Sequence, residues 1–93
     1  MIAGLMRVRL ILREAFSLKD KRSVVKGIKD RVRERFNVSI AEVDELDARQ
    51  RAELGVAVVG NDRRHMEGVL QQVLRHVRAA PGVEVAGHEV EYF

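Results

Sequence analysis

The spacing of apolar residues switches repeatedly between two residues and three to four residues, and this alternation constrains the fold more than any other feature of the chain. Residues 2–13 alternate between an apolar face and a mixed face, which predicts a long half-buried strand. A stretch that begins at Ser17 or Asp20 and runs to about Phe36 then repeats at helical spacing. Its predicted buried side consists of Val24, Val25, Ile28, Val32 and Phe36.

The second half of the chain repeats this order with one more strand. Residues 37–44 and 49–59 predict two strands joined by an acidic turn. Gly60-Asn61-Asp62 ends the second strand and caps a helix that Pro81-Gly82 should end. Residues 83–92 predict a last strand, and the flip of its apolar parity predicts a bulge near Ala86-Gly87.

The resulting order β-α-β-β-α-β is that of the ferredoxin-like α/β (α+β) fold. We expect one domain over residues 1–93, with two helices on one face of a four-stranded antiparallel sheet. Lys21 is the exception to the pattern, because its helical phase points toward the buried side. Either the helix starts after Lys21, or the side chain reaches solvent at the edge of the core.

Basic charge is concentrated on the first predicted helix. Residues 19–35 hold eight Lys or Arg and three acidic residues, a local charge of +5, whereas the whole chain carries +3. Five of these cations fall in one narrow stripe away from the apolar side: Lys19, Arg22, Lys26, Lys29 and Arg33. The stripe either contacts a polyanion or is a solvated surface on which Asp30 and Glu34 supply local ion pairs.

The predicted open face of the sheet carries more charge. We expect Arg7, Arg9 and Arg13 to share it with Arg49, Arg51 and Glu53, and with Glu89 or Glu91 from the last strand. A cross-strand Arg–Glu ladder is favoured there over base contacts, because no central strand carries an aromatic residue for stacking. A third interpretation is that Leu5, Ile11, Ala57 and Val59 on this face seal a homodimer.

Other chemistry has little support in the sequence. There is no cysteine, and His65, His76 and His88 lack zinc-site spacing, so we expect no metal and no cofactor. The acidic residues 42–47 lack the turn glycine of a calcium loop, and contact with another subunit's basic helix is at least as plausible as cation binding. No catalytic motif is present, so we expect no enzyme.

The setting of the protein is predicted only broadly. The N-terminal apolar run is broken by Arg7 and Arg9, so we expect neither a signal peptide nor a membrane segment. The lack of cysteine suits a reducing cytoplasm. Thirteen of the 17 basic residues are Arg, and Asn, Gln and Met are few, a composition that fits a heat-tolerant source.

Three segments carry a family resemblance. They are Ser17-Leu-Lys-Asp-Lys-Arg-Ser-Val-Val-Lys26, Phe36-Asn-Val-Ser-Ile-Ala-Glu-Val-Asp44 and Gln50-Arg-Ala-Glu-Leu-Gly-Val-Ala57. Together they resemble the YlxP-like family of small bacterial proteins, whose domain has no known function. The resemblance implies a ferredoxin-like fold and, in many bacteria, an operon shared with translation initiation factor two and a ribosome-binding factor.

The matched positions also suggest a site. The resemblance groups Lys21, Glu42, Gln50, Glu53 and Gly55 where the start of the basic helix meets the ends of the second and third strands. Our leading hypothesis is a noncatalytic module that binds ribosomal RNA or a ribosomal subunit. In it, the basic stripe contacts phosphates, Arg49 and Arg51 assist, and the absence of stacking aromatics favours recognition of backbone or shape. The alternatives are a homo-oligomeric scaffold, as a dimer through the open face, and a regulator that binds a small molecule at a subunit interface near Gln50, Arg51, Glu53 and Gly55.

Overall fold

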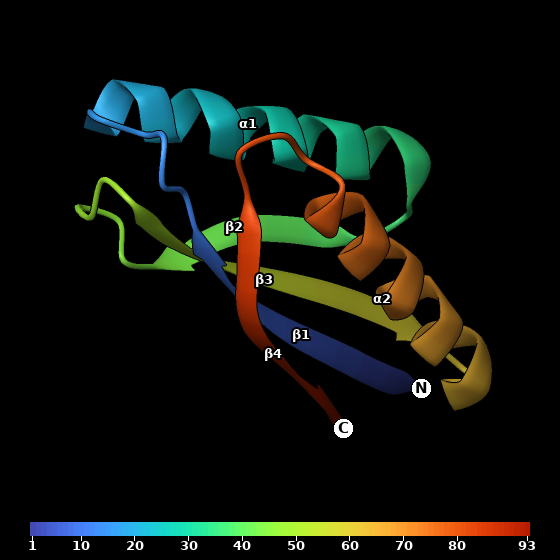
Figure 1. Ribbon diagram of the computed structural model, residues 1–93. Coiled ribbons are helices and arrows are strands. Elements are labelled where there is room, and N and C mark those ends of the chain that lie inside the picture. The colour runs from blue at the N-terminus through green and yellow to red at the C-terminus, as the bar shows by residue number, and fades with distance from the viewer.

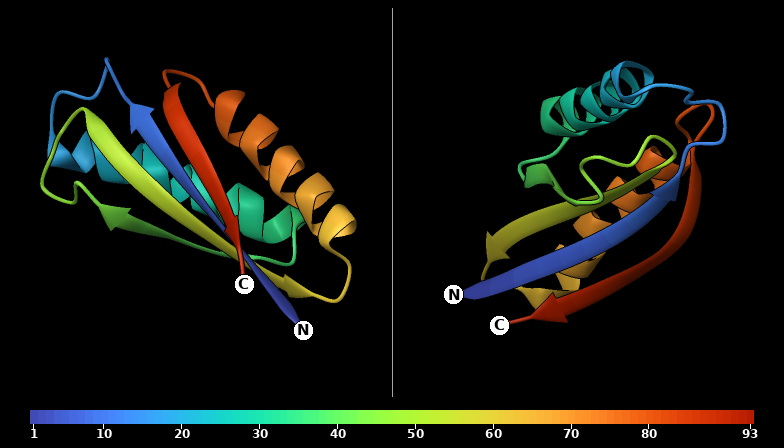
Figure 2. Two further views of the ribbon diagram at one scale, coloured as in Figure 1. Left: turned by 90° about the horizontal axis from the view of Figure 1, so that it is seen from below. Right: turned by 90° about the vertical axis from the view of Figure 1, so that its left-hand side faces the viewer.

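Four antiparallel strands form one sheet in the order β2-β3-β1-β4, and both helices lie on the same face of it (Figures 1 and 2). The computed structural model describes all 93 residues. Its elements, in chain order, are β1 (Ile2–Ile11), α1 (Leu18–Arg35), β2 (Ser39–Asp44), β3 (Arg51–Gly60), α2 (Arg63–Arg78) and β4 (Glu84–Tyr92). The predicted ferredoxin-like arrangement is therefore confirmed.

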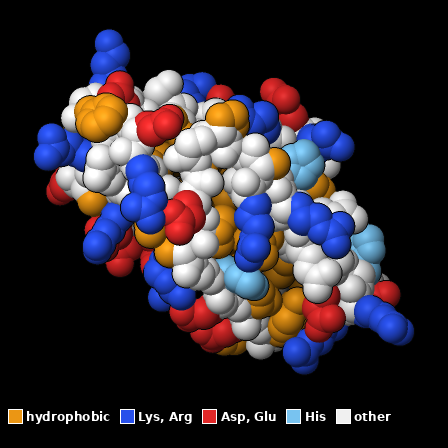
Figure 3. Space-filling view, viewed as in Figure 1, with side chains coloured by type: hydrophobic (Ala, Val, Ile, Leu, Met, Phe, Trp, Pro, Cys, Tyr) orange, Lys and Arg blue, Asp and Glu red, His pale blue; other side chains and the backbone are white.

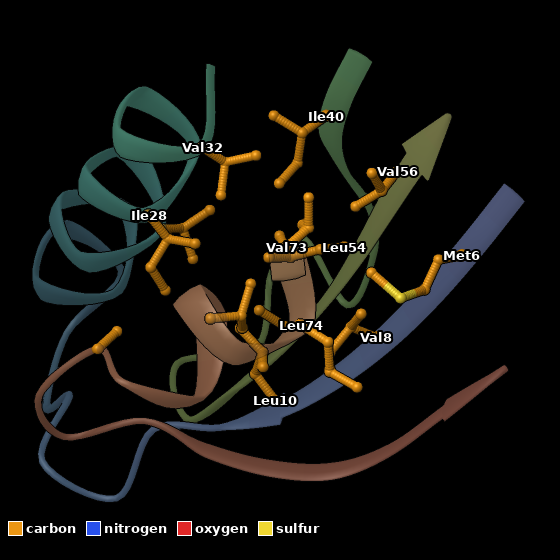
Figure 4. Close-up of a cluster of buried hydrophobic side chains, with 14 of the residues drawn as sticks. Met6, Val8, Leu10, Ile28, Val32, Ile40, Leu54, Val56, Val73 and Leu74 are labelled. Atoms are coloured by element: carbon orange, nitrogen blue, oxygen red, sulfur yellow. The ribbon is translucent and has the colours of Figure 1, made fainter. Parts of the chain in front are cut away.

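The core lies between the helices and the sheet. The central strand β1 pairs with β3 along its whole length and with β4 on its other side. Alternate β1 residues, such as Met6, Val8 and Leu10, point toward the helices and are buried, as the two-residue spacing predicted. They meet apolar side chains from both helices, among them Ile28 and Val73, in one cluster of 19 buried residues (Figure 4).

Side-chain caps fix where the helices begin. The Ser17 hydroxyl accepts a hydrogen bond from the backbone N–H of Asp20 at 3.0 Å, so α1 starts one residue later. The Asp62 carboxylate accepts from the N–H groups of Arg64 and His65 and starts α2. Helix α2 ends at Arg78, before the predicted stop at Pro81-Gly82. Neither helix has both the length and the apolar character needed to cross a membrane.

Two bulges shape the sheet. Arg9 lies opposite Gly87 and Leu10 lies opposite Val85, so Ala86 is the extra residue in β4, as the parity flip predicted. A second bulge was not predicted. It falls at Val43 in β2, because Glu42 lies opposite Leu54 and Asp44 lies opposite Glu53.

The turn between α2 and β4 requires glycine. Pro81 and Gly82 occupy its two central positions, Gly82 has a φ of +72°, and the Val83 N–H donates to the Ala80 carbonyl at 3.3 Å. This is the pattern of a type II turn. The glycine in α2 is different, because a β-carbon on Gly68 would meet no atom within 4 Å.

The two glycines should respond oppositely to alanine. We expect Gly82→Ala to lower the free energy of unfolding by about 1–2 kcal/mol, since alanine is strained at positive φ. Gly68→Ala should raise it by about 0.5–1 kcal/mol, since alanine restricts the unfolded chain and favours the helix. Urea unfolding of both variants measures this, and equal effects of the same sign would contradict the turn geometry.

Candidate nucleic-acid interface

Lys21 is fully buried, with no exposed side-chain surface. The two predicted explanations of this residue are both wrong: α1 starts before it, at Leu18, and its ammonium does not reach solvent. The helical phase correctly pointed the side chain inward. Lys21 can stay inside because oxygen atoms of β2, β3 and the loop between them surround its ammonium.

Four oxygen atoms surround the Lys21 ammonium. Its Nζ donates to the carbonyl oxygens of Glu45 at 2.8 Å, Leu46 at 3.2 Å and Arg51 at 3.3 Å. The Glu42 carboxylate Oε2 lies 2.8 Å away but makes no hydrogen bond of good geometry. The three ammonium protons thus serve the three carbonyls, while the Glu42 charge balances the buried charge of Lys21.

This arrangement joins the start of α1 to the loop between β2 and β3. The two segments lie at the same end of the molecule, at the left of Figure 1. Lys19 and Arg22, within two residues of Lys21 in the sequence, are exposed there. Arg49, predicted to lie within the third strand, instead belongs to the loop, because β3 begins at Arg51.

The five cations of the basic stripe fall into two groups. Lys26 pairs with Asp30 at 2.7 Å. Arg33 donates from Nη2 to the Ile40 carbonyl on the edge strand β2 at 2.8 Å, and its Nη1 lies 3.9 Å from the Asp30 carboxylate. The other three, Lys19, Arg22 and Lys29, make no ion pair or side-chain hydrogen bond, so their charges stay uncompensated.

Asp30 is the acidic residue that moderates the stripe. The hydrogen bond from Lys26 lowers the pKa of Asp30 below its usual 3.8, and the nearby charges of Arg33 and Lys29 act in the same direction. Asp30 is therefore ionised at neutral pH, and it competes with any external anion for Lys26 and Arg33.

Ion pairs cover the open face of the sheet. Across it, Arg7 lies 3.4 Å from Glu53, Arg9 lies 2.8 Å from Glu89 and Arg13 lies 3.0 Å from Glu84. Each of the three arginines predicted to lie on this face thus has a glutamate partner, and together the pairs form the expected Arg–Glu ladder. Exposed pairs of this kind contribute about 0–1 kcal/mol each, but they remove net positive charge from this face.

Most apolar residues of the open face gather at one end, where Leu5 and Ala57 line a hollow with Ala41 and Val43. Leu5 lies opposite Ala57, with Val59 one pair further along, opposite Ala3. Ile11 lies at the far end, opposite Arg51, beyond the band of arginines. The four residues predicted to seal a dimer are thus split between the two ends of the face.

The residues grouped by the family motif divide between the two faces of the sheet. Lys21 and Glu42 meet on the helix side, and Gln50 donates from Nε2 to the Arg13 carbonyl at 3.1 Å. Glu53 pairs with Arg7 on the open face. There Gly55 lies beneath Val43, whose methyl group would come within 2.9 Å of a β-carbon at position 55.

The acidic turn and the histidines play local roles. Asp44 accepts from the Glu45 N–H at 2.7 Å, and Glu45 adopts a φ of +60°. The His76 ring contacts Phe36 edge-on, with centroids 5.2 Å apart. No three acidic or histidine side chains lie close enough together to hold a metal ion.

Sequence reasoning missed two aromatic environments. Phe16, between β1 and α1, is 73% exposed and lines a hollow with Arg49, Gln50 and Arg51. The Arg63 guanidinium lies 4.4 Å from the centre of the Tyr92 ring, and burial together with the charge of Glu67 raises the pKa of Tyr92. Phe16 could have been noticed as an apolar residue that fits neither the strand alternation nor the helix stripe.

The geometry defines a small ferredoxin-like domain with a basic helix surface. A family model described as "Protein of unknown function (DUF503)" matches residues 3–90, and the chain belongs to this family. It is 39% identical over 90 residues to the uncharacterized protein YlxP of Bacillus subtilis (strain 168), covering 97% of this chain and 98% of that one.

Two solved structures are similar at lower levels. A dimeric ferredoxin-like protein of unknown function from Thermobifida fusca has a TM-score of 0.45 and 13% identity, over 98% of this chain and 90% of that one. LarC2, the C-terminal domain of a cyclometallase involved in the synthesis of the NPN cofactor of lactate racemase, has a TM-score of 0.46 and 11% identity. That match covers all of this chain but only 56% of LarC2.

Replacing Lys21 should destabilise the protein strongly. We expect Lys21→Met to lower the free energy of unfolding by about 3–5 kcal/mol, because it leaves the Glu42 charge and three carbonyls without their cation. The matched control is Lys19→Met, the same change at an exposed, unpaired lysine, which should cost less than about 0.5 kcal/mol. Urea unfolding compares them, and similar values for the two would contradict the described role of Lys21.

Proposed function

We propose that this protein is a noncatalytic RNA-binding module associated with the ribosome, and that the basic stripe of α1 is its RNA-contacting surface. The observation that carries the proposal is the set of uncompensated cations at Lys19, Arg22 and Lys29. When such side chains neutralise phosphates, they release the cations that are condensed on the nucleic acid, and this release favours binding.

The distribution of charge supports α1 over the sheet. Arg7, Arg9 and Arg13 on the open face already have carboxylate partners, so an RNA phosphate would have to compete with a glutamate for each of them. The stripe has only one competing acid, Asp30. From Lys19 to Arg33 it runs about 21 Å at the helical rise of 1.5 Å per residue, enough to follow several phosphates along a backbone.

The setting of the family favours the ribosome among possible RNAs. The operon that the family resemblance implies places such proteins with a translation initiation factor and a ribosome-binding factor. The central strands β1 and β3 carry no aromatic residue, the half-buried Tyr92 lies against Arg63, and the exposed Phe93 lies at the edge beside Ala3. Recognition of the RNA backbone is therefore proposed for the stripe.

Reversing the three uncompensated cations should abolish most of the binding. We expect Lys19→Glu/Arg22→Glu/Lys29→Glu to bind ribosomal subunits and a ribosomal RNA fragment far more weakly than the wild type. The slope of log affinity against log salt should become shallower by about 2, the value for three lost phosphate contacts. Co-sedimentation and fluorescence anisotropy across a salt series measure both effects.

The control variant reverses three cations elsewhere. Arg64, Arg75 and Arg78 lie on α2, are exposed, and make no ion pair. Arg64→Glu/Arg75→Glu/Arg78→Glu changes the net charge equally but should retain the wild-type salt slope. Equal losses of RNA affinity in the two triple variants would mean that only the net charge of the protein matters. If the wild type binds no RNA at low salt, the proposal is removed.

Removing Asp30 should strengthen binding. Asp30→Asn releases Lys26 and Arg33 from their acidic partner while it keeps the side-chain shape. We expect higher RNA affinity and a salt slope steeper by about 1, as one to two further cations reach phosphates. Glu34→Gln, on the same helix, removes an acid that makes no ion pair, and it should change the affinity less. An Asp30→Asn variant that binds more weakly would contradict the competition between Asp30 and phosphate.

The same variant has a defined pH signature. The pKa of Asp30 is lower in the folded protein than its usual 3.8, so its carboxylate stabilises the fold above that pH. This contribution is lost as the pH falls through the folded-state value. The wild type should therefore exceed Asp30→Asn in stability at neutral pH, and the difference should shrink toward zero in strong acid, as measured by urea unfolding at several pH values.

A further inference from the structure

We propose that the hollow beside Phe16 holds one unpaired nucleobase of the bound RNA, stacked on the Phe16 ring. This inference rests on the proposed function and adds a base contact to it. The bound species would then be single-stranded RNA, or a loop with an unstacked base, because a base inside a duplex cannot reach the ring.

The Phe16 ring is exposed but its backbone is held in place. Its N–H donates to the Asp20 carboxylate at 3.2 Å, while the Asp20 N–H donates to the Ser17 hydroxyl. These two hydrogen bonds fix Phe16 directly before α1. A large ring that is 73% exposed on fixed backbone offers a flat apolar surface, which a base can cover without ordering a flexible segment.

The other wall of the hollow is basic. Arg49 and Arg51 line it together with Phe16, and neither makes an ion pair, so both guanidinium groups are free for the phosphates that flank a stacked base. No acidic side chain lines this hollow. Asp44 and Glu45, from the same loop, line a neighbouring hollow that shares Arg51 and also contains Arg9 and Glu53.

Gln50 adds a polar edge to the hollow. One N–H of its amide donates to the Arg13 carbonyl at 3.1 Å, which fixes the side chain. The amide oxygen has no partner and can accept from an exocyclic amino group of a base. Lys21 holds the loop from below through the Glu45, Leu46 and Arg51 carbonyls, so the wall is positioned before any RNA binds.

The hollow continues the basic stripe. Lys19 and Arg22 lie in the first turns of α1, immediately after Phe16 in the sequence. Figure 3 shows exposed hydrophobic surface flanked by Lys and Arg side chains at the end of the molecule where α1 begins. One strand of RNA can therefore place phosphates along α1 and insert a base next to Phe16.

The test uses a labelled 12-nucleotide single-stranded oligo(A), the same RNA with one abasic position at a time, and a 12-base-pair RNA duplex. We expect Phe16→Ala to bind oligo(A) about 5- to 150-fold more weakly, the range for loss of one stacked base. Its salt slope should be unchanged, because no phosphate contact is lost. Duplex affinity should be equal for the wild type and Phe16→Ala.

The control is Phe93→Ala, which removes a ring that is 69% exposed at the opposite end of β1. This variant should bind oligo(A) like the wild type.

A direct reporter is available because the chain contains no tryptophan. Phe16→Trp should restore the affinity lost in Phe16→Ala, and its emission should be quenched by oligo(A) but not by RNA that lacks the stacked base. If the wild type binds, the α1 triple variant does not, and Phe16→Ala binds normally, the stacking inference is overturned while the proposed function stands. If the wild type binds no RNA at low salt, the proposed function itself fails.

Discussion

The buried ammonium of Lys21 is the interaction on which the rest of the structure depends. Removing a charged amine from water costs several kcal/mol even after the surroundings relax. That cost is offset only where Glu42 from β2 and the carbonyls of the β2–β3 loop and β3 converge on it. These partners are 21 to 30 residues away in sequence, so they surround the ammonium only when α1 lies against the correct end of the sheet. A shifted register of β2 would leave a bare charge in the core, and the ion pair thereby selects one arrangement of helix, strand and loop.

The same interaction determines which charges remain for a partner. Lys21 forms an ion pair with Glu42, and the arginines on the open face of the sheet form ion pairs with Glu53, Glu84 and Glu89. These glutamates therefore pair with cations of the sheet and the core. In the basic stripe of α1, Asp30 is the only acidic residue that forms ion pairs. Because the field of a surface follows its uncompensated charges, we expect a polyanion to favour the helix layer over the open sheet, although the sheet carries several arginines.

Hydrophobic spacing predicted the element order and the β4 bulge, because each depends on which face of an element is buried. The α2 cap was predicted from the capping residues Gly60-Asn61-Asp62, while the α1 cap was left open between Ser17 and Asp20. Hydrophobic spacing did not predict the β2 bulge, since Val43 and Asp44 are exposed and their inward-facing neighbour Glu42 is charged, so no apolar alternation marks the bulge. The environment of Lys21 was beyond reach for another reason. Its phase showed that the side chain points inward, but three of its four partners are backbone carbonyls, and any residue type supplies these. Pairing within the stripe depends on rotamers and on Ile40 of the edge strand, which helical phase alone does not place.

Position and rigidity together explain why the candidate base-binding hollow lies at one end of the molecule. The loop that carries Arg49 and Gln50 would be free to move if only its own turn held it, because its polar residues bury little apolar surface. Lys21 fixes it through hydrogen bonds from the core side, leaving the outward side chains to face the start of α1. Binding that needs no ordering of a loop retains more of its interaction energy. The buried lysine is therefore both the element that specifies the fold and the support that would make a basic, aromatic-walled hollow suitable for RNA.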